Sequence, residues 1–352
     1  MKPNRLTYTF IVLLSLCVII AVSVRYLEKE VLISGKTMGT TYHIKIVLPF
    51  YKSSGSFKKA IDRELDNINL SMSTYRNDSE ISRFNSHHNA GDPFPVSQDF
   101  YTVMKTAQTI YMLSGGAWDG TVKPLIDLWG FGKEPLRTTL PDPAEIKSIL
   151  ENVGFDNIMI TDDNTPDKTL VKKRGDISLD LASIAKGYGV DVISRYLTEE
   201  GVENYLVEIG GEVYAKGERK DHVSWRVGIN TPEKMSAPDA VYEVVALKNT
   251  ALATSGDYRN FIEIKGQSYS HIIDPRTGYP ITNGVISVSV AAETCVMADG
   301  LATAIMVMGP EAGIEMVDKM KNVECLIIVK DGNDGYADHY SEHFRELLYK
   351  AD

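Results

Sequence analysis

The chain has 352 residues, of which 37 are Lys or Arg and 47 are Asp or Glu, giving a formal net charge of −10. Its apolar share of 43% and charged share of 24% are close to globular averages, so the composition excludes a disordered, collagen-like or disulfide-rich chain. The negative charge argues against nucleic-acid binding, which needs a basic surface. An acidic protein that binds a phosphate-bearing ligand needs a specific device to hold it.

The N-terminus carries a membrane signal. Residues 6–24 contain no charged side chain and follow two basic residues. A helix of this length spans about 30 Å of hydrocarbon, and the run is longer than the core of a usual signal peptide. A retained anchor is therefore favoured over a cleaved signal peptide, although Ala21 and Ser23 would suit cleavage. Lipidation at Cys17 is disfavoured, because Leu16 stands where a small residue is expected.

The charge order also predicts a topology. Because basic residues precede the apolar run, residue 26 onward is expected outside the cytoplasm. We expect residues 1–30 to form the membrane segment and residues 31–352 to form the folded domain.

The folded part mixes helix and strand patterns. In chain order, the patterns predict a strand at 41–48, helices at 57–72 and about 98–113, a helix at 183–200, strands at 204–209, 213–216, 224–229, 241–247, 260–265 and 285–291, a helix at about 296–308 and a strand at 324–330. The strands of the second half follow one another without intervening helices. This order favours an α+β fold with largely antiparallel sheets and flanking helices.

Cysteine and histidine patterns give little chemistry. Cys295 and Cys325 lie in apolar sequence, which favours two buried thiols over a disulfide. His339 and His343 have the spacing of one helical face, and a solvated surface is favoured there over a metal site, since structural zinc needs four ligands.

The segment MADGLATAIMVMG at 297–309 offers oxygen ligands. Asp299 and Thr303 are four residues apart in a predicted helix, so their side chains share one face. A carboxylate and a hydroxyl suit Mg²⁺ that keeps water or phosphate oxygens as further ligands. The alternative is that Asp299 caps the helix and Thr303 bonds to the preceding turn.

The segment LDLASIAKGYGVD at 179–191 predicts a helix start. Asp180 followed by Ser183 is an N-cap pattern, and helix N-termini bind phosphates well. Lys186 opposes the helix dipole there, which an anionic partner would explain. A lysine that extends into solvent is the alternative.

Three further residues stand beside glycine-rich or polar loops. His271 in SHIIDPRTGYPI can act as a base near neutral pH or stack on an aromatic ligand, although a lone histidine is more often structural. Tyr75 and Trp118 are single aromatic residues, and for Trp118 alone core packing is favoured.

Taken together, these segments resemble the ApbE family of FAD:protein FMN transferases over roughly residues 31–330. The most specific motifs are D-L-x-x-I-A-K-G-Y, H-I-I-D-P-x-T-G-x-P and A-D-G-L-A-T-A. The resemblance implies one catalytic body of two packed lobes with an ApbE/T-fold-like architecture. It also implies a Mg²⁺-dependent enzyme that cleaves FAD, transfers FMN to a Thr or Ser hydroxyl of a partner protein and releases AMP.

The resemblance assigns site residues motif by motif. FAD-contacting positions are matched by Met38, Tyr75, Ala117, Trp118, Asp119, Asp180, Lys186, His271 and Ile273. Metal-ligand positions are matched by Ser183, Asp299, Ala302 and Thr303, with Ala302 able to offer only backbone oxygen. We expect Lys186 to neutralise phosphate charge, and His271 or Asp180 to accept the hydroxyl proton.

Partners and alternatives follow from the same resemblance. Family acceptors are periplasm-facing subunits of redox complexes such as the sodium-pumping NADH:quinone oxidoreductase (Nqr) and Rnf, so we expect a catalytic domain on the periplasmic side of a bacterial inner membrane. The alternatives are a FAD pyrophosphatase that releases FMN and AMP, and a non-catalytic flavin-binding or metal-trafficking protein.

Overall fold

The computed structural model of the chain describes Ser15 and residues 27–132, 139–161, 164–233, 240–257, 261–264, 266–332 and 335–350. The uncharged run 6–24 lies outside these residues, apart from Ser15. Within the described ranges, no helix has both the length and the apolar character needed to cross a bilayer. The expected membrane segment therefore stays a prediction.

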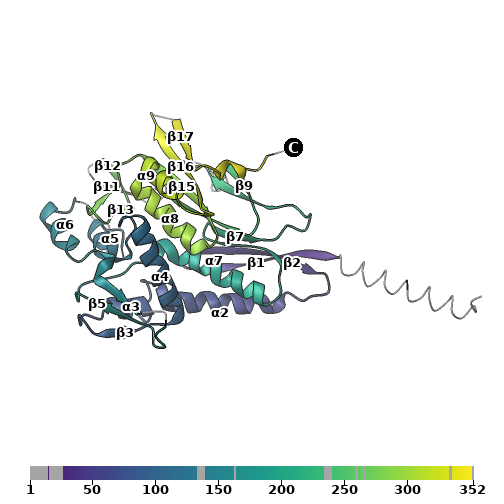
Figure 1. Ribbon diagram of the computed structural model, residues 1–352, viewed down its shortest axis with the longest axis horizontal. Coiled ribbons are helices and arrows are strands. Elements are labelled where there is room, and N and C mark those ends of the chain that lie inside the picture. Colours follow the sequence, from purple (N-terminus) through teal and green to yellow (C-terminus); the bar gives the residue numbers. More distant parts are fainter. Residues whose placement is uncertain are drawn as a thin grey trace, which may run out of the picture.

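An antiparallel sheet of eight strands organises the fold (Figure 1). In spatial order its strands are β1 (Glu28–Thr37), β2 (Thr40–Pro49), β6 (Asn204–Ile209), β7 (Glu212–Lys216), β10 (Thr250–Gly256), β15 (Val285–Ala292), β16 (Glu324–Asp331) and β17 (Gly335–Tyr340). The other strands form smaller sheets. One has the order β3 (Pro93–Pro95), β5 (Thr169–Lys172) and β4 (Ile158–Ile160). The rest are two-stranded: β8 (Trp225–Asn230) with β9 (Val241–Leu247), β11 (Phe261–Ile264) with β12 (Gln267–Ser270), and β13 (Ile273–Asp274) with β14 (Tyr279–Pro280). Every strand pairing in the described ranges is antiparallel, which confirms the expected α+β class.

Helices cover one face of this sheet (Figure 1). The α-helices are α2 (Gly55–Met72), α3 (Glu80–Asn85), α4 (Gln98–Leu113), α5 (Lys123–Trp129), α6 (Pro143–Leu150), α7 (Ala182–Glu199), α8 (Cys295–Met308) and α9 (Pro310–Val317), and short 3₁₀ turns are η1 (Gly120–Val122), η2 (Phe155–Asn157) and η3 (Phe344–Glu346). The apolar face expected for α2 is buried, with Ile61, Leu65, Ile68 and Met72 at most 4% exposed.

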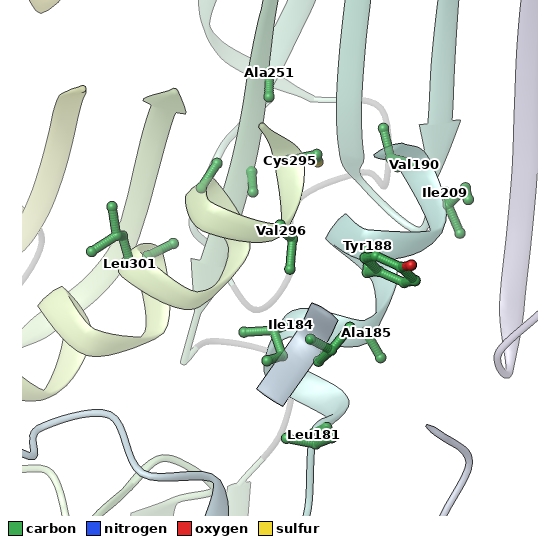
Figure 2. Packing of buried hydrophobic residues seen from close by; sticks show 14 of the residues in the cluster. Leu181, Ile184, Ala185, Tyr188, Val190, Ile209, Ala251, Cys295, Val296 and Leu301 are labelled. Carbon is green, nitrogen blue, oxygen red and sulfur yellow. The ribbon is translucent and has the colours of Figure 1, made fainter. Parts of the chain in front are cut away.

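Alternation along the strands builds two cores. In β16, Cys325 and Ile327 pack with the helices, whereas Leu326 and Ile328 pack with the β8–β9 ribbon and Phe344. Successive strand residues point to opposite faces, so one strand serves both layers. The helix side is the larger core, and the contact of α7 with α8 in it positions the candidate site (Figure 2).

One local expectation is wrong and another is confirmed. His339 lies in β17, so the helix expected around His339 and His343 is wrong: a spacing of four also occurs in a strand and the turn after it. The cysteine expectation is confirmed, because Cys295 and Cys325 are both free and buried.

Candidate functional site

The site begins where α7 and α8 touch. A Cβ placed on Gly187 of α7 would lie 2.4 Å from the backbone oxygen of Cys295 and 2.8 Å from Cβ of Asp299. The N–H of Gly187 donates to Oδ2 of Asp299 at 2.9 Å. This approach, which a larger residue would prevent, holds Asp299 at 3% exposure inside the helix pair. Asp299 therefore does not cap α8.

Three charged groups gather at this contact. Nζ of Lys186 donates to Oε1 of Glu212 at 2.8 Å and lies 3.8 Å from Oδ1 of Asp299. Burial raises the pKa of Glu212 to about 8 and also raises the pKa of Asp299. Burial alone would lower the pKa of Lys186, but the two carboxylates outweigh it and raise that pKa above its usual value. Two buried carboxylates thus share one ammonium, and the surplus negative charge is balanced either by a proton, as the raised pKa values indicate, or by a second cation.

The neighbouring turn of α8 supplies a hydroxyl. Thr303 bonds across to Ser255 of β10, with 3.0 Å between their hydroxyl oxygens, rather than only to its own helix. Ala302 is fully buried beside it. Within the described ranges no group of three or more His, Cys, Asp or Glu side chains could hold a metal ion. A cation bound here would therefore depend on Asp299 together with hydroxyl, backbone or ligand oxygens, which suits Mg²⁺.

The start of α7 is tied to the loop before η1. Nε1 of Trp118 donates to Oγ of Ser183 at 2.9 Å, and the N–H of Asp180 donates to the backbone oxygen of Gly120 at 2.8 Å. Oδ1 of Asp180 accepts the N–H of Ala182 at 2.8 Å, so Asp180 caps the helix from one residue before the N-cap position, Leu181. Burial raises the pKa of Asp180. These bonds place Trp118, Asp180 and Ser183 side by side.

Asp119 braces this loop from inside. Oδ1 of Asp119 accepts the N–H of Thr121 at 2.7 Å and its hydroxyl at 2.6 Å, and Oδ2 accepts the N–H of Phe155 at 2.9 Å. Burial raises the pKa of Asp119 to about 6. Ala117 and Trp118 beside it are 1% and 2% exposed. The core packing considered for Trp118 is therefore real, and it coexists with the bond to Ser183.

His271 lies near the C-terminal end of β10. Its Nδ1 is 3.9 Å from Oδ1 of Asp257, and its ring meets Phe131 edge-on at 6.3 Å between centroids. Asp257 is two residues after Ser255, which contacts Thr303, so the end of β10 links the histidine to the α8 oxygens. Ile273 is 6% exposed and packs with the small core around Trp129.

The turn of the β1–β2 hairpin lies against α7. Its turn holds Met38 at a positive φ of 48°, and a Cβ on Gly189 of α7 would lie 3.1 Å from Cε of Met38. Residues 36–41 line a cavity of about 450 Å³ at this turn. Met38 therefore stands between the cavity and the helix that carries Lys186.

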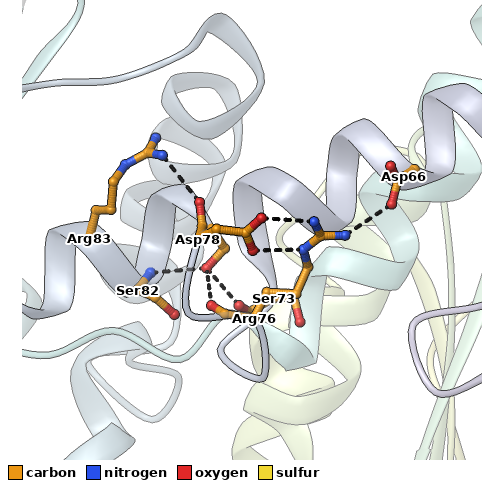
Figure 3. Close-up of polar contacts among 7 residues, drawn as sticks. Asp66, Ser73, Arg76, Asp78, Ser82 and Arg83 are labelled. Atoms are coloured by element: carbon orange, nitrogen blue, oxygen red, sulfur yellow. Dashed lines mark hydrogen bonds and ion pairs between the residues drawn. The ribbon is translucent and has the colours of Figure 1, made fainter.

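Tyr75 belongs to the loop between α2 and α3, whose neighbouring residues are held by the polar contacts of Figure 3. Arg76 donates two hydrogen bonds to Asp78, both at 3.0 Å, and one to Asp66 of α2 at 3.1 Å. Ser79 donates to the backbone oxygens of Ser73 and Arg76. Tyr75 is 74% exposed, which suits contact with a ligand more than core packing.

Sequence analysis did not identify two carboxylates of this region. Glu212 has no partner nearby in sequence, and only its burial beside Lys186 identifies it. Asp191 accepts the N–H groups of Cys295 and Val296 at 2.8 and 2.9 Å and so caps α8 from another helix. A cap supplied from about a hundred residues away leaves no local pattern.

Comparison with known proteins gives one consistent family. The sequence model described as "ApbE family" matches residues 38–327. The FAD:protein FMN transferase of Vibrio cholerae is 44% identical over 92% of this chain and 94% of its own length, and that of Haemophilus influenzae is 38% identical over 94% and 96%. The solved structure of "Flavin Transferase ApbE from Vibrio cholerae" superposes with a TM-score of 0.81 at 43% identity, over 91% of this chain and all of that one.

Proposed function

The chain belongs to the ApbE family, and from this membership we propose that it transfers FMN from FAD to an acceptor protein. The observation that carries the proposal is the buried cluster of Lys186, Glu212 and Asp299, which lies beside the hairpin cavity and the Trp118–Ser183 contact. The cluster supplies an ammonium for a phosphate and carboxylate oxygen for a cation, the device that an acidic protein needs for a dinucleotide.

The reaction joins a Thr or Ser hydroxyl oxygen of the acceptor to the phosphorus of the FMN half of FAD. The pyrophosphate P–O bond breaks, and AMP leaves with its electron pair. Lys186 is placed to neutralise charge that spreads over the phosphate oxygens. The hydroxyl proton needs an acceptor, for which we propose His271, whose Nδ1 lies 3.9 Å from Oδ1 of Asp257, or Asp180 at the start of α7.

We further propose that the site takes Mg²⁺. Asp299 and Thr303 would hold the ion through their side chains, with Ser183 and the backbone of Ala302 as neighbouring oxygen sources. The spare negative charge of the Lys186 cluster and the partnerless Oε2 of Glu212 in the described ranges fit a dication better than a neutral ligand. When bound, the ion would stabilise negative charge on the reacting phosphoryl oxygens.

For partners and location, we propose an acceptor subunit of an Nqr-type or Rnf-type redox complex. The uncharged run 6–24 would hold the chain in a bacterial inner membrane with the catalytic domain in the periplasm, since the basic residues precede that run. Protease added to spheroplasts that express the full chain should then cut the domain without lysis.

One experiment separates this proposal from its alternatives. The full chain is incubated with FAD, MgCl₂ and a candidate acceptor, and the acceptor is then weighed by mass spectrometry. A covalent FMN adduct supports transfer. AMP and FMN without an adduct would indicate a pyrophosphatase, and intact FAD would indicate a binding protein. Acceptor with its target Thr or Ser replaced by Ala is the matched control.

A further inference from the structure

Glu212 occupies a position that the backbone fixes closely. It is the first residue of β7 and pairs with Ile209 across the two-residue turn Gly210–Gly211. Both glycines have positive φ, 64° and 107°, which few other residues adopt without strain. A Cβ on Gly210 would lie 2.8 Å from Cγ2 of Thr40 and 3.3 Å from Cδ of Lys186. The turn therefore brings the carboxylate of Glu212 under the lysine stem, at the edge of the cavity that Thr40 lines.

The contacts of this carboxylate are unequal. Oε1 accepts the ammonium of Lys186 at 2.8 Å, whereas Oε2 is buried without a hydrogen-bond partner within the described ranges. The side chain of Glu212 is 5% exposed, and that of Lys186 is 29% exposed. The pair thus has a buried end at the glutamate and an open end at the lysine.

A purely structural role explains this arrangement poorly. A buried ion pair is seldom more stabilising than apolar residues of the same volume, because desolvation opposes the Coulomb attraction. A buried carboxylate oxygen without a donor is a further cost. Buried charges with strongly perturbed surroundings are typical of functional sites, where they act on a ligand.

The distances show what the pair achieves. Nζ of Lys186 is 2.8 Å from Oε1 of Glu212 but 3.8 Å from Oδ1 of Asp299, so the ammonium hydrogen-bonds Glu212 and makes only a longer ion pair with Asp299. Without Glu212, the nearest carboxylate for the ammonium is Asp299, and a direct bond would cover Oδ1. Glu212 therefore keeps the cation of Lys186 and an oxygen of Asp299 separately available.

We propose that Glu212 is a positioning residue for FMN transfer: it holds the ammonium of Lys186 toward the phosphates of FAD and leaves Oδ1 of Asp299 open. The inference rests on the proposed flavin transfer. Glu212 acts through Lys186, so its effect vanishes when Lys186 carries no charge.

A double-mutant cycle tests this dependence. The full chain is prepared as wild type, Glu212→Gln, Lys186→Met and the double variant, and kcat and KM for FMN transfer are measured together with the dissociation constant of FAD. We expect Glu212→Gln to lower kcat/KM by about 10–100-fold, the range for residues that orient a functional group. The double variant should be no worse than Lys186→Met alone.

Two controls address folding and local damage. Glu208→Gln changes a glutamate on the same hairpin that bonds His43 and the N–H of Gly211 instead of Lys186. The amide oxygen of Gln can still accept the N–H of Gly211, so this variant should keep wild-type kinetics. Glu212→Asp keeps the charge on a shorter stem, so it should recover part of the loss even if Glu212→Gln folds poorly. Thermal unfolding of each variant reports folding separately from kinetics.

The outcomes are distinct. Wild-type kinetics for Glu212→Gln, or losses that multiply in the double variant, would overturn the positioning role. A wild-type chain that forms no FMN adduct would overturn the proposed transfer instead. In that case the dissociation constants of FAD test the positioning role of Glu212, because Lys186 is expected to contact the phosphates in binding as well as in turnover. The double variant should then bind FAD no more weakly than Lys186→Met alone.

Discussion

Replacing Gly187 by Ala tests whether the α7–α8 contact builds the site. The new Cβ would lie 2.4 Å from the backbone oxygen of Cys295, so the helices must separate by about 0.6 Å to bring that contact to 3.0 Å. A backbone oxygen cannot rotate away as a side chain does. Overpacking of this kind costs about 1–3 kcal/mol or more, against a gain of about 1 kcal/mol from the higher helix propensity of Ala.

The matched control is Gly189→Ala, two positions further on the same buried stretch of α7. Its Cβ would meet only the ends of side chains, Cε of Met38 at 3.1 Å and Cδ1 of Ile209 at 3.3 Å, so the propensity gain should roughly cancel the crowding. Chemical denaturation gives both free energies of unfolding. We expect Gly187→Ala to be less stable than Gly189→Ala and to lose FMN transfer, because Asp299 moves with α8. Equal stability of Gly187→Ala and wild type would refute the reasoning.

Three further changes follow from single contacts. Asp299→Asn removes the buried negative charge at nearly constant volume and should lower FMN transfer by about 100-fold or more across a Mg²⁺ titration; transfer at the wild-type rate would contradict the assignment. Trp118→Phe loses the bond to Ser183, about 1 kcal/mol, and should lower the unfolding midpoint by about 2 °C; Ser183→Ala, which removes the acceptor and keeps the indole, should give a loss of similar size. Burial raises the pKa of Asp119 from its usual 3.8 to about 6, so the native state holds that proton longer than the unfolded state. The contribution of protonated Asp119 to the free energy of unfolding is complete below about pH 4 and is lost as the pH rises through 6. The stability advantage of wild type over Asp119→Asn should therefore shrink over that window. An advantage that grows with pH would contradict the raised pKa.

The sequence predicted the periodic elements well. Ile61, Leu65, Ile68 and Met72 had helical spacing, and all four are buried in α2. The strand β1 was missed, because its second half reads SGKT and resembles a polar glycine loop. The strand β10 was missed for a different reason. Its sequence ALATSG shows no polar alternation because both faces are covered: Ala251 and Ala253 pack in the helix-side core, and Leu252 packs in the core under the β8–β9 ribbon.

The candidate site was predictable where chemistry follows local motifs. Asp299 and Thr303 share one face of α8, and Ser183 and Lys186 lie on the first turns of α7, as the spacing indicated. Glu212 was not predictable, because its role depends on a hairpin turn placing it under a lysine 26 positions earlier in the chain. Burial and pairing, which single-sequence patterns do not carry, distinguish it from the other glutamates.

The braced loop between α2 and α3 has a thermodynamic consequence. Ordering a free backbone costs about 1–2 kcal/mol of conformational entropy per residue, and a binding loop that orders only with its ligand subtracts that cost from affinity. Arg76 ties the loop to Asp66 and Asp78 before any ligand arrives (Figure 3). Under the proposed function, an aromatic ring of FAD that stacked on Tyr75 would therefore meet a loop whose conformational entropy was already lost during folding, and binding there would not include that ordering cost.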